Sequence, residues 1–138
     1  MTDEILNTRC PLFRWQDCGD IISIEHLEAI NQICLNTPTV KHWLPTMENH
    51  IVRHFILKHQ KFASNLTVRI SSKLIDQIPN YDWKYSSMVS RDVKQIFNDK
   101  AKFNGENFLI CNAHKWSNRC WVCSGCWTFK GIIIYPLH

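Results

Sequence analysis

Residues 66–71 read Leu-Thr-Val-Arg-Ile-Ser, a stretch in which apolar and polar side chains alternate strictly. Alternation with a period of two is typical of a β-strand, because successive side chains on a strand point to opposite faces. Residues 63–65, Ala-Ser-Asn, separate this stretch from a helical pattern before it. Residues 66–71 therefore predict the last strand of a strand–helix series.

The segments ahead of this strand predict two more strands and two helices. Apolar residues recur at helical spacing from Ile24 to Cys34, Ser23 can cap that helix, and Thr37-Pro38 stops it. Strands that alternate with helices of about ten residues are joined by right-handed crossovers in a parallel sheet. We therefore expect an α/β fold with a compact βαβαβ-type parallel sheet. The other expected elements are strands at residues 12–15 and 40–44 and a second helix from about Met47 to Lys58.

Beyond residue 71 the pattern is weaker, and the sequence does not decide whether residues 72–105 join the sheet. Because 138 residues are the size of one domain, we expect a single domain over residues 1–138. In it, residues 106–138 carry a cysteine-rich segment. The elements expected in this half are a turn at residues 79–82, a short helix within residues 90–100, and strands at residues 108–111 and 132–135.

Four cysteines near the C-terminus are spaced C-x8-C-x2-C-x2-C: Cys111, Cys120, Cys123 and Cys126. Two residues between thiols allow a tight turn to point both sulfurs at one centre. A second C-x2-C that shares the middle cysteine makes a chance pattern less frequent. Gly125, between the last two thiols, permits a positive φ in such a turn. The spacing therefore predicts a bound metal or cluster, in preference to disulfides or free thiols.

The choice of metal follows from how the cysteines are grouped. Thiolates suit either tetrahedral zinc or an iron–sulfur cluster, but structural zinc sites usually pair two separate C-x2-C hairpins. Here three cysteines share one short segment, which can offer one sulfur to each of three irons. We expect a [4Fe–4S] cluster, with Zn²⁺ as the alternative. Trp116, Trp121 and Trp127 either keep water from the thiols or pack locally, and His114 is a substitute ligand that four thiols do not require.

A second set of polar residues follows the predicted strands: Arg14, Asp20, Thr46 and Arg69. Ligands of parallel α/β folds bind outside the carboxyl ends of the strands, so these side chains are candidates for one pocket. There Asp20 can bind a cation or accept a hydrogen bond, and the arginines can hold an anion. The alternative is structural, with Asp20 and Ser23 capping a helix and the arginines in salt bridges.

Composition and charge limit the classes of partner. A formal net charge of +4 permits nucleic acid or an acidic protein without requiring either. The first residues have neither a basic start nor a long apolar run, and no stretch approaches the ~18 apolar residues of a membrane span. We therefore expect a cytoplasmic protein without a membrane partner, in a compartment where thiols stay reduced.

Several short motifs are spread along the chain: Phe13-Arg14 with Gly19-Asp20, Thr37-Pro38, residues 43–46, residues 65–71, Cys111, the C-x2-C-x2-C-W run, Tyr135-Pro136 and His138. Together they resemble the motifs of the phage gene-product-eighty-eight-like proteins, a group from phages and prophages. The C-terminal cysteines are the most specific part of this resemblance. It implies a viral protein in the host cell cytoplasm, and strand–helix repeats similar to the partial barrels of radical-SAM proteins.

A complete radical-SAM enzyme requires a C-x3-C-x2-C loop and more strand–helix units, and the sequence contains neither. The cysteine spacing favours a protein that binds a [4Fe–4S] cluster, and the resemblance implies a small phage-type protein with a redox or host-modulating role and a host protein or redox partner. The alternative is a zinc-stabilised module that binds nucleic acid or a host protein. The sequence does not decide whether the protein is an enzyme, but it favours a protein without catalytic activity.

Overall fold

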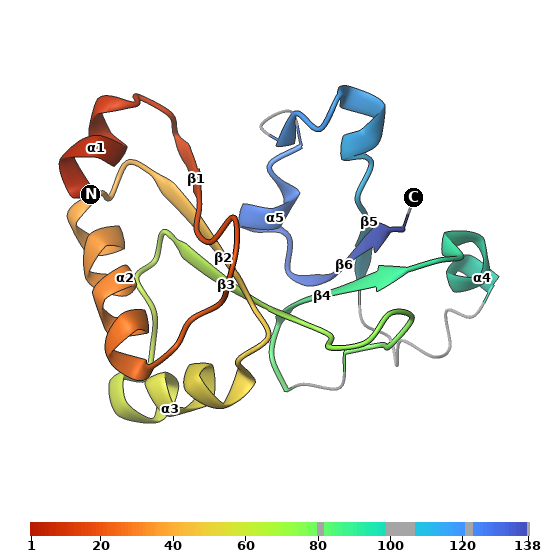
Figure 1. Cartoon of the computed structure of the whole chain (residues 1–138), viewed down its shortest axis with the longest axis horizontal. Helices are drawn as coiled ribbons and strands as arrows, with labels where there is room; N and C mark the ends of the chain where they lie inside the picture. The colour runs from red at the N-terminus through yellow and green to blue at the C-terminus, as the bar shows by residue number, and fades with distance from the viewer. Residues whose placement is uncertain (80–81, 99–106, 121–122, 138) are drawn as a thin grey trace. The chain divides into compact units, whose positions relative to one another are not determined.

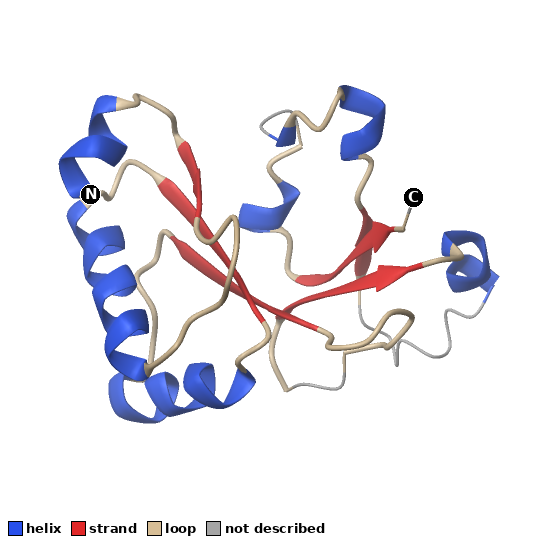
Figure 2. Ribbon diagram, in the orientation of Figure 1, coloured by secondary structure: helices blue, strands red, loops and turns tan. Residues whose placement is uncertain are grey.

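The computed structural model describes residues 1–79, 82–98, 107–120 and 123–137 (Figure 1). Helices and strands alternate along most of the chain (Figure 2). The elements are α1 (Thr2–Asn7), β1 (Leu12–Arg14), α2 (Ile24–Asn36), β2 (Lys41–Thr46), α3 (Asn49–His59), β3 (Leu66–Ser71), β4 (Tyr85–Ser90), α4 (Val93–Asn98), β5 (Phe108–Ile110), the 3-10 helix η2 (Ala113–Trp116), α5 (Gly125–Thr128) and β6 (Gly131–Pro136).

The strands form a six-stranded sheet in the order β1-β2-β3-β4-β6-β5, and every pair with a described register is parallel. The expected α/β class and parallel sheet are confirmed. The chain divides into two compact units, Met1–Val68 and Arg69–His138, with the boundary inside β3. The expectation of a single domain over residues 1–138 stays a prediction.

In the first unit, α2 begins and ends where the sequence predicts. The Ser23 hydroxyl accepts the His26 N–H at 3.2 Å, which satisfies one of the free donors of the first turn. The apolar face buries Leu27, Ile30 and Cys34. At the other end the Thr37 hydroxyl donates to the Ile33 carbonyl at 2.8 Å, and Pro38 follows.

The side-chain amide of Asn65 joins the end of α2 to the start of β2. It donates to the carbonyls of Cys34, Thr37 and Val40, at distances between 2.8 and 3.0 Å. Two of these carbonyls also accept a backbone N–H, Cys34 from Thr37 and Thr37 from Val40, so the amide adds a second donor to each. The residue directly before β3 thus fixes the connection between the two preceding elements.

Strand β2 is longer than expected, because it continues through Pro45 to Thr46. Its described pairing with β1 ends where Arg14 faces Trp43. Pro45 lies beyond that pairing, so its missing N–H removes no hydrogen bond from the β1–β2 ladder.

The second unit contains β4, which the sequence analysis did not predict. Three of its residues are serines, and Ser86, Ser87 and Ser90 are all buried. Each hydroxyl has a hydrogen-bond partner, so burial leaves none unsatisfied. Residues 72–105 therefore do contribute to the sheet. A short helix within residues 90–100 is confirmed as α4.

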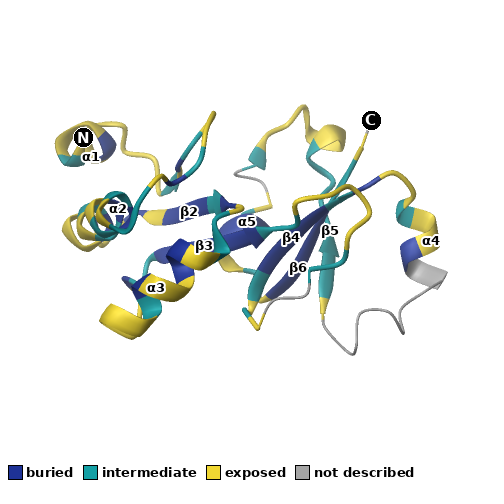
Figure 3. Cartoon of the chain, turned by 60° about the horizontal axis from the view of Figure 1, so that its bottom comes forward, coloured by how far each residue is buried: buried dark blue, intermediate teal, exposed yellow. Residues whose placement is uncertain are grey.

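The core of the second unit lies along β4 and β6. Met88, Ile96, Ile132 and Ile134 form a buried cluster, and the partly buried Phe108 packs against it. Figure 3 shows β4 and β6 largely buried and β5, at the end of the strand order, only partly so. The strands expected at residues 108–111 and 132–135 are thus present, as β5 and β6.

His42 on β2 is fully buried in the first unit, where its ring stacks on Trp15 at a centroid distance of 5.9 Å. Its Nε2 lies 2.8 Å from the Thr37 hydroxyl. Burial lowers the pKa of His42 to about 4, because the charged imidazolium loses its hydration. The ring is therefore neutral in the folded protein at neutral pH.

We predict that this histidine makes folding stability depend on pH. The unfolded chain binds the His42 proton near the ordinary pKa of about 6.5, and the native chain only near pH 4. Stability is therefore insensitive to His42 above about pH 7, and it falls by about 3 kcal/mol as the pH drops from 6.5 to 4. Urea unfolding in EDTA at several pH values measures this slope.

The matched variants are His42→Gln, which keeps a polar partner for Thr37, and His50→Gln on the exposed start of α3. His42→Gln should flatten the slope between pH 6.5 and 4, and His50→Gln should leave it in place. An unchanged slope in His42→Gln would show that other groups set the acid sensitivity.

Candidate metal centre

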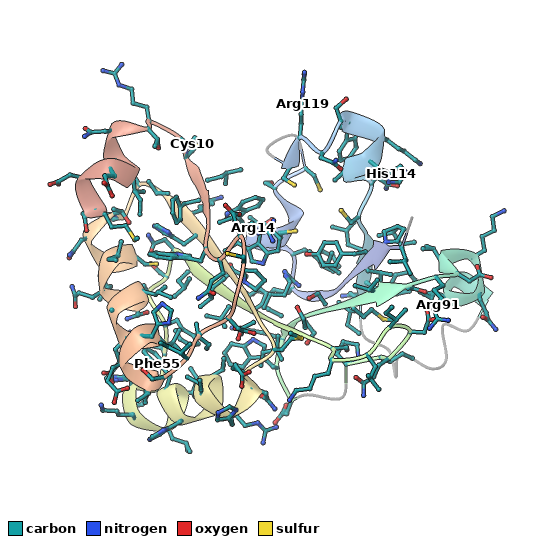
Figure 4. All side chains as sticks on the ribbon, viewed as in Figure 1. Cys10, Arg14, Phe55, Arg91, His114 and Arg119 are labelled. Carbon is teal, nitrogen blue, oxygen red and sulfur yellow. The ribbon has the colours of Figure 1, made fainter. Side chains whose placement is uncertain are left out.

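The four cysteines lie in the second unit, on the segment that joins β5 to β6 by way of α5. Strand β5 runs parallel beside β6 and ends directly before Cys111. The Cys111 N–H donates to the Ile134 carbonyl at 2.8 Å, so the sheet ladder fixes the position of this residue. Figure 4 shows sulfur atoms gathered along this blue segment.

A tight turn carries Cys120 and Cys123. Ser117 and Asn118 both have left-handed backbones, with φ of 51° and 60°, and they reverse the chain after η2. The Cys120 carbonyl then accepts the N–H groups of Cys123 and Ser124, both at 3.1 Å. The C-x2-C spacing thus corresponds to a hydrogen-bonded turn, which is the local geometry that paired thiol ligands need.

Gly125 supplies space and not a special backbone angle. Its neighbour Ser124 has the positive φ, of 51°, whereas Gly125 begins α5. A Cβ at Gly125 would lie 2.8 Å from Leu109 Cδ2 and 3.2 Å from Cys123 Sγ. The expected role in a positive-φ turn is therefore wrong, and the missing side chain instead lets the Cys123 sulfur approach α5.

The thiols act on one another electrostatically. Burial and, to a smaller extent, the charges of Cys111 and Cys120 raise the pKa of Cys126 to about 11, against the lowering effect of the Tyr135 hydroxyl 3.2 Å away. Burial also raises the pKa of Cys111, and the charges of Cys120 and Cys123 act in the same direction. Cys111 and Cys126 are therefore protonated at neutral pH.

The four cysteines share one segment of the second unit, but their sulfurs do not form a closed ligand set. Among the described residues, no three His, Cys, Asp or Glu side chains meet the geometry of a metal site. The donor chemistry nevertheless fits a soft metal, since a coordinating metal ion deprotonates thiols outright. The four-cysteine site therefore stays a prediction, which the residue spacing and the donor chemistry support.

The other candidate groups of this segment separate into exposed and buried ones. His114 and Arg119 are exposed and point outward in Figure 4. Trp116 is 38% exposed, whereas Trp127 is buried beside Cys126 on α5. Trp121 lies outside the described residues. Of the tryptophans described here, Trp127 is the one placed to keep water from the thiols.

Arg69 lies wholly inside the second unit and does not face solvent. One terminal nitrogen donates to the carbonyls of Ser86 and Gly131, at 2.8 and 3.0 Å. The other donates to Phe129 at 2.7 Å and to Cys126 at 3.5 Å. Its Nε has no hydrogen-bond partner. The sequence alternatives, a salt bridge or a solvent-facing anion site, did not anticipate a guanidinium held by backbone carbonyls.

Asp20 and Thr46 are brought together in the first unit. The Thr46 hydroxyl donates to Asp20 Oδ1 and accepts the Glu48 N–H at 3.0 Å. Asp20 also accepts the Met47 N–H at 2.7 Å. Because the Glu48 side chain makes no capping bond, these contacts satisfy donors just before α3. Asp20 therefore organises the start of α3, while Ser23 alone caps α2.

Arg14 takes a different position from the one its candidate role required. It is exposed on β1, and its guanidinium carbon lies 5.0 Å from the centroid of the Trp43 ring. Such a contact is a cation–π interaction. No hydrogen bond or ion pair is described between Arg14 and Asp20, so these two residues act separately within the first unit.

Three further cysteines lie in the first unit. Cys34 is buried on α2, where burial raises its pKa to about 12, in line with a core residue. Cys10 and Cys18 are exposed. The other four cysteines belong to the second unit.

A cavity of about 340 Å³ opens at the amino ends of β4 and β6 in the second unit. It contains none of the four cysteines, and two lysines give it a basic edge. The sequence analysis did not single it out, because its lining comes from loops without a motif. The lining residues are Asp82, Trp83, Lys84, Ser86, Asn107, Lys130, Gly131 and Ile132.

The parallel sheet and the cysteine segment define an α/β protein with a cysteine-rich C-terminal part. The chain belongs to the gene product 88 family, whose model matches residues 1–128 and so includes all four cysteines. This match confirms the family that the scattered motifs indicated. No curated protein and no solved structure matches the chain. In the part of the chain that the structure describes, none of the helices is long and apolar enough to cross a membrane.

We predict that Asp20→Ala lowers the free energy of unfolding by about 2–3 kcal/mol, because three donors lose a charged acceptor. Asp17→Ala, on the exposed part of the same loop, should change it by less than about 0.5 kcal/mol. Urea unfolding measures both values. Equal small effects would mean that Asp20 is not a structural residue and would reopen the ligand-binding hypothesis.

Proposed function

We propose that this protein binds a [4Fe–4S] cluster through Cys111, Cys120, Cys123 and Cys126, in a phage-type redox or host-modulating role. The observation that carries the proposal is the spacing of these thiols along one segment of the chain. Cys120 and Cys123 come from one turn, Cys126 follows on α5, and Cys111 comes directly after β5. That grouping suits a cubane better than a single zinc ion.

The protein's own contribution would be to position and shield the bound group. Such a cluster transfers one electron at a time at a potential set by its surroundings. Trp127 is buried on α5 and would limit access of water, and the Tyr135 hydroxyl lies 3.2 Å from Cys126 Sγ. A hydrogen bond to a ligand sulfur and a low local dielectric are two of the factors that tune a cluster.

The second candidate is a zinc-stabilised module that binds nucleic acid or a host protein. The hydrogen-bonded Cys120–Cys123 turn is compatible with a zinc knuckle. Lys115 and Arg119 are exposed on the same segment, and the formal net charge of the chain is +4. Basic groups beside a small metal-held loop are a common arrangement for contacts with phosphates.

Anaerobic purification followed by absorbance spectroscopy and metal analysis tests the proposal. We expect a brown protein with a broad band near ~400 nm and about four iron and four sulfide ions per chain after reconstitution. A colourless protein with one tightly bound zinc would contradict the cluster and favour the zinc module. In that case binding to DNA or RNA should weaken as salt rises, because phosphate contacts release counterions. A chain that binds neither metal contradicts both candidates.

Replacement of one ligand gives a separate prediction. Cys123→Ser should lose the metal and lower the Tm by roughly 5–10 °C, since metal binding contributes to the free energy of folding. Cys18→Ser, at an exposed cysteine of the first unit, is the matched control and should keep the full metal content and the same Tm. Full metal content and an unchanged Tm in Cys123→Ser would show that the ligand assignment is wrong.

A further inference from the structure

Arg69 is the single Lys, Arg, Asp or Glu that is buried among the residues the structure describes. Long cationic side chains are almost never fully buried unless they are paired with an opposite charge. No carboxylate of the described residues lies within ion-pair distance of its guanidinium. Backbone carbonyls satisfy its terminal nitrogens, but they do not cancel its charge, and Nε has no acceptor.

Three groups that can become anionic interact with the charge of Arg69: Tyr135 on β6, Cys126 on α5 and Tyr85 on β4. The Tyr85 ring centroid lies 5.7 Å from the guanidinium carbon. The carbonyl of Cys126 lies 3.5 Å from one terminal nitrogen of Arg69, and the Cys126 Sγ lies 3.2 Å from the Tyr135 hydroxyl. Because Arg69 is fully buried and no described carboxylate pairs with it, the cation has no carboxylate counter-charge.

A metal–thiolate centre would supply that counter-charge. Four thiolates outweigh the positive charge of a zinc ion or of an oxidised cluster, so the centre as a whole is anionic. Arg69 is already held against the main chain that carries the ligands, through the carbonyls of Cys126 and Phe129. Its other contacts, to Ser86 and Gly131, anchor the same guanidinium to β4 and β6.

We propose that Arg69 is the internal counter-cation of the metal–thiolate centre. The inference rests on the proposed function and applies to a cluster and to zinc alike. Its charge stabilises the thiolate form of the ligands and thereby raises the affinity for the metal. With a cluster bound, the same charge favours the added electron and raises the reduction potential. Arg69 is thus a positioning and charge-compensating residue and does not itself bind the metal.

The competing explanation is purely structural. Arg69 would then only join the end of α5 to the strands through four carbonyl contacts. Charge and hydrogen bonding can be separated by two substitutions. Arg69→Lys keeps the positive charge with fewer donors, whereas Arg69→Gln keeps an amide donor and removes the charge.

Zinc affinity of the full-length chain, measured by competition with a chromophoric chelator, is the primary readout. We expect Arg69→Gln to bind zinc about 10- to 100-fold more weakly than the unaltered chain, and Arg69→Lys to stay within about threefold. With a reconstituted cluster, Arg69→Gln should have a more negative reduction potential and Arg69→Lys an unchanged one. Tyr135→Phe is the control, since it removes the contact with Cys126 without changing charge and should have the smaller effect.

Circular dichroism melting of the metal-free variants separates stability from affinity. Arg69→Gln and Arg69→Lys should be destabilised to a similar extent without metal, because both lose carbonyl contacts. Equal losses of affinity in the two variants, or no loss in Arg69→Gln, would overturn the counter-cation role and leave the proposed function intact. If Arg69→Gln does not fold, the zinc affinity of Arg69→Lys tests the proposal by itself. A zinc affinity of Arg69→Lys clearly below that of the unaltered chain would then contradict the counter-cation role. An unaltered chain that binds neither zinc nor a cluster would contradict both the counter-cation role and the proposed function.

Discussion

The second unit is organised around one buried guanidinium. Arg69 donates to carbonyls of β4, of α5 and of the first residue of β6, so a single side chain connects β4 with two elements about forty residues further along the chain. Hydrogen bonds to an ionised donor are stronger than neutral ones, and they require that each acceptor keep its place. The segment that carries the cysteines is thereby tied to the sheet, and its geometry depends on that anchor.

Most of the first unit could be predicted because its signals are local. Ser23 marks the start of α2, Thr37-Pro38 marks its end, and the alternating residues of β3 indicate a strand. Strand β4 lacked such a signal, since three serines give it neither apolar periodicity nor strong β-propensity. Its place depends on partners that are remote in sequence, such as the Ser71 hydroxyl that meets Ser87 at 2.8 Å.

The candidate site shows the same division between local and distant information. The C-x2-C turn and the strand before Cys111 follow from residue spacing. The roles of Asp20 and Arg69 did not follow, because both are decided by backbone groups that no motif encodes. Sequence alone also treated Arg14, Asp20, Thr46 and Arg69 as one set. The structure pairs Asp20 with Thr46, sets Arg14 on Trp43, and buries Arg69 in the other unit.

The two strands at the ends of the sheet, β1 and β5, are each three residues long. An outer strand exposes unpaired N–H and C=O groups, which can recruit a strand from another molecule. Ends as short as these present few such groups, so the sheet is a poor template for intermolecular pairing. The brevity of its outermost strands thus protects the chain against aggregation through its sheet.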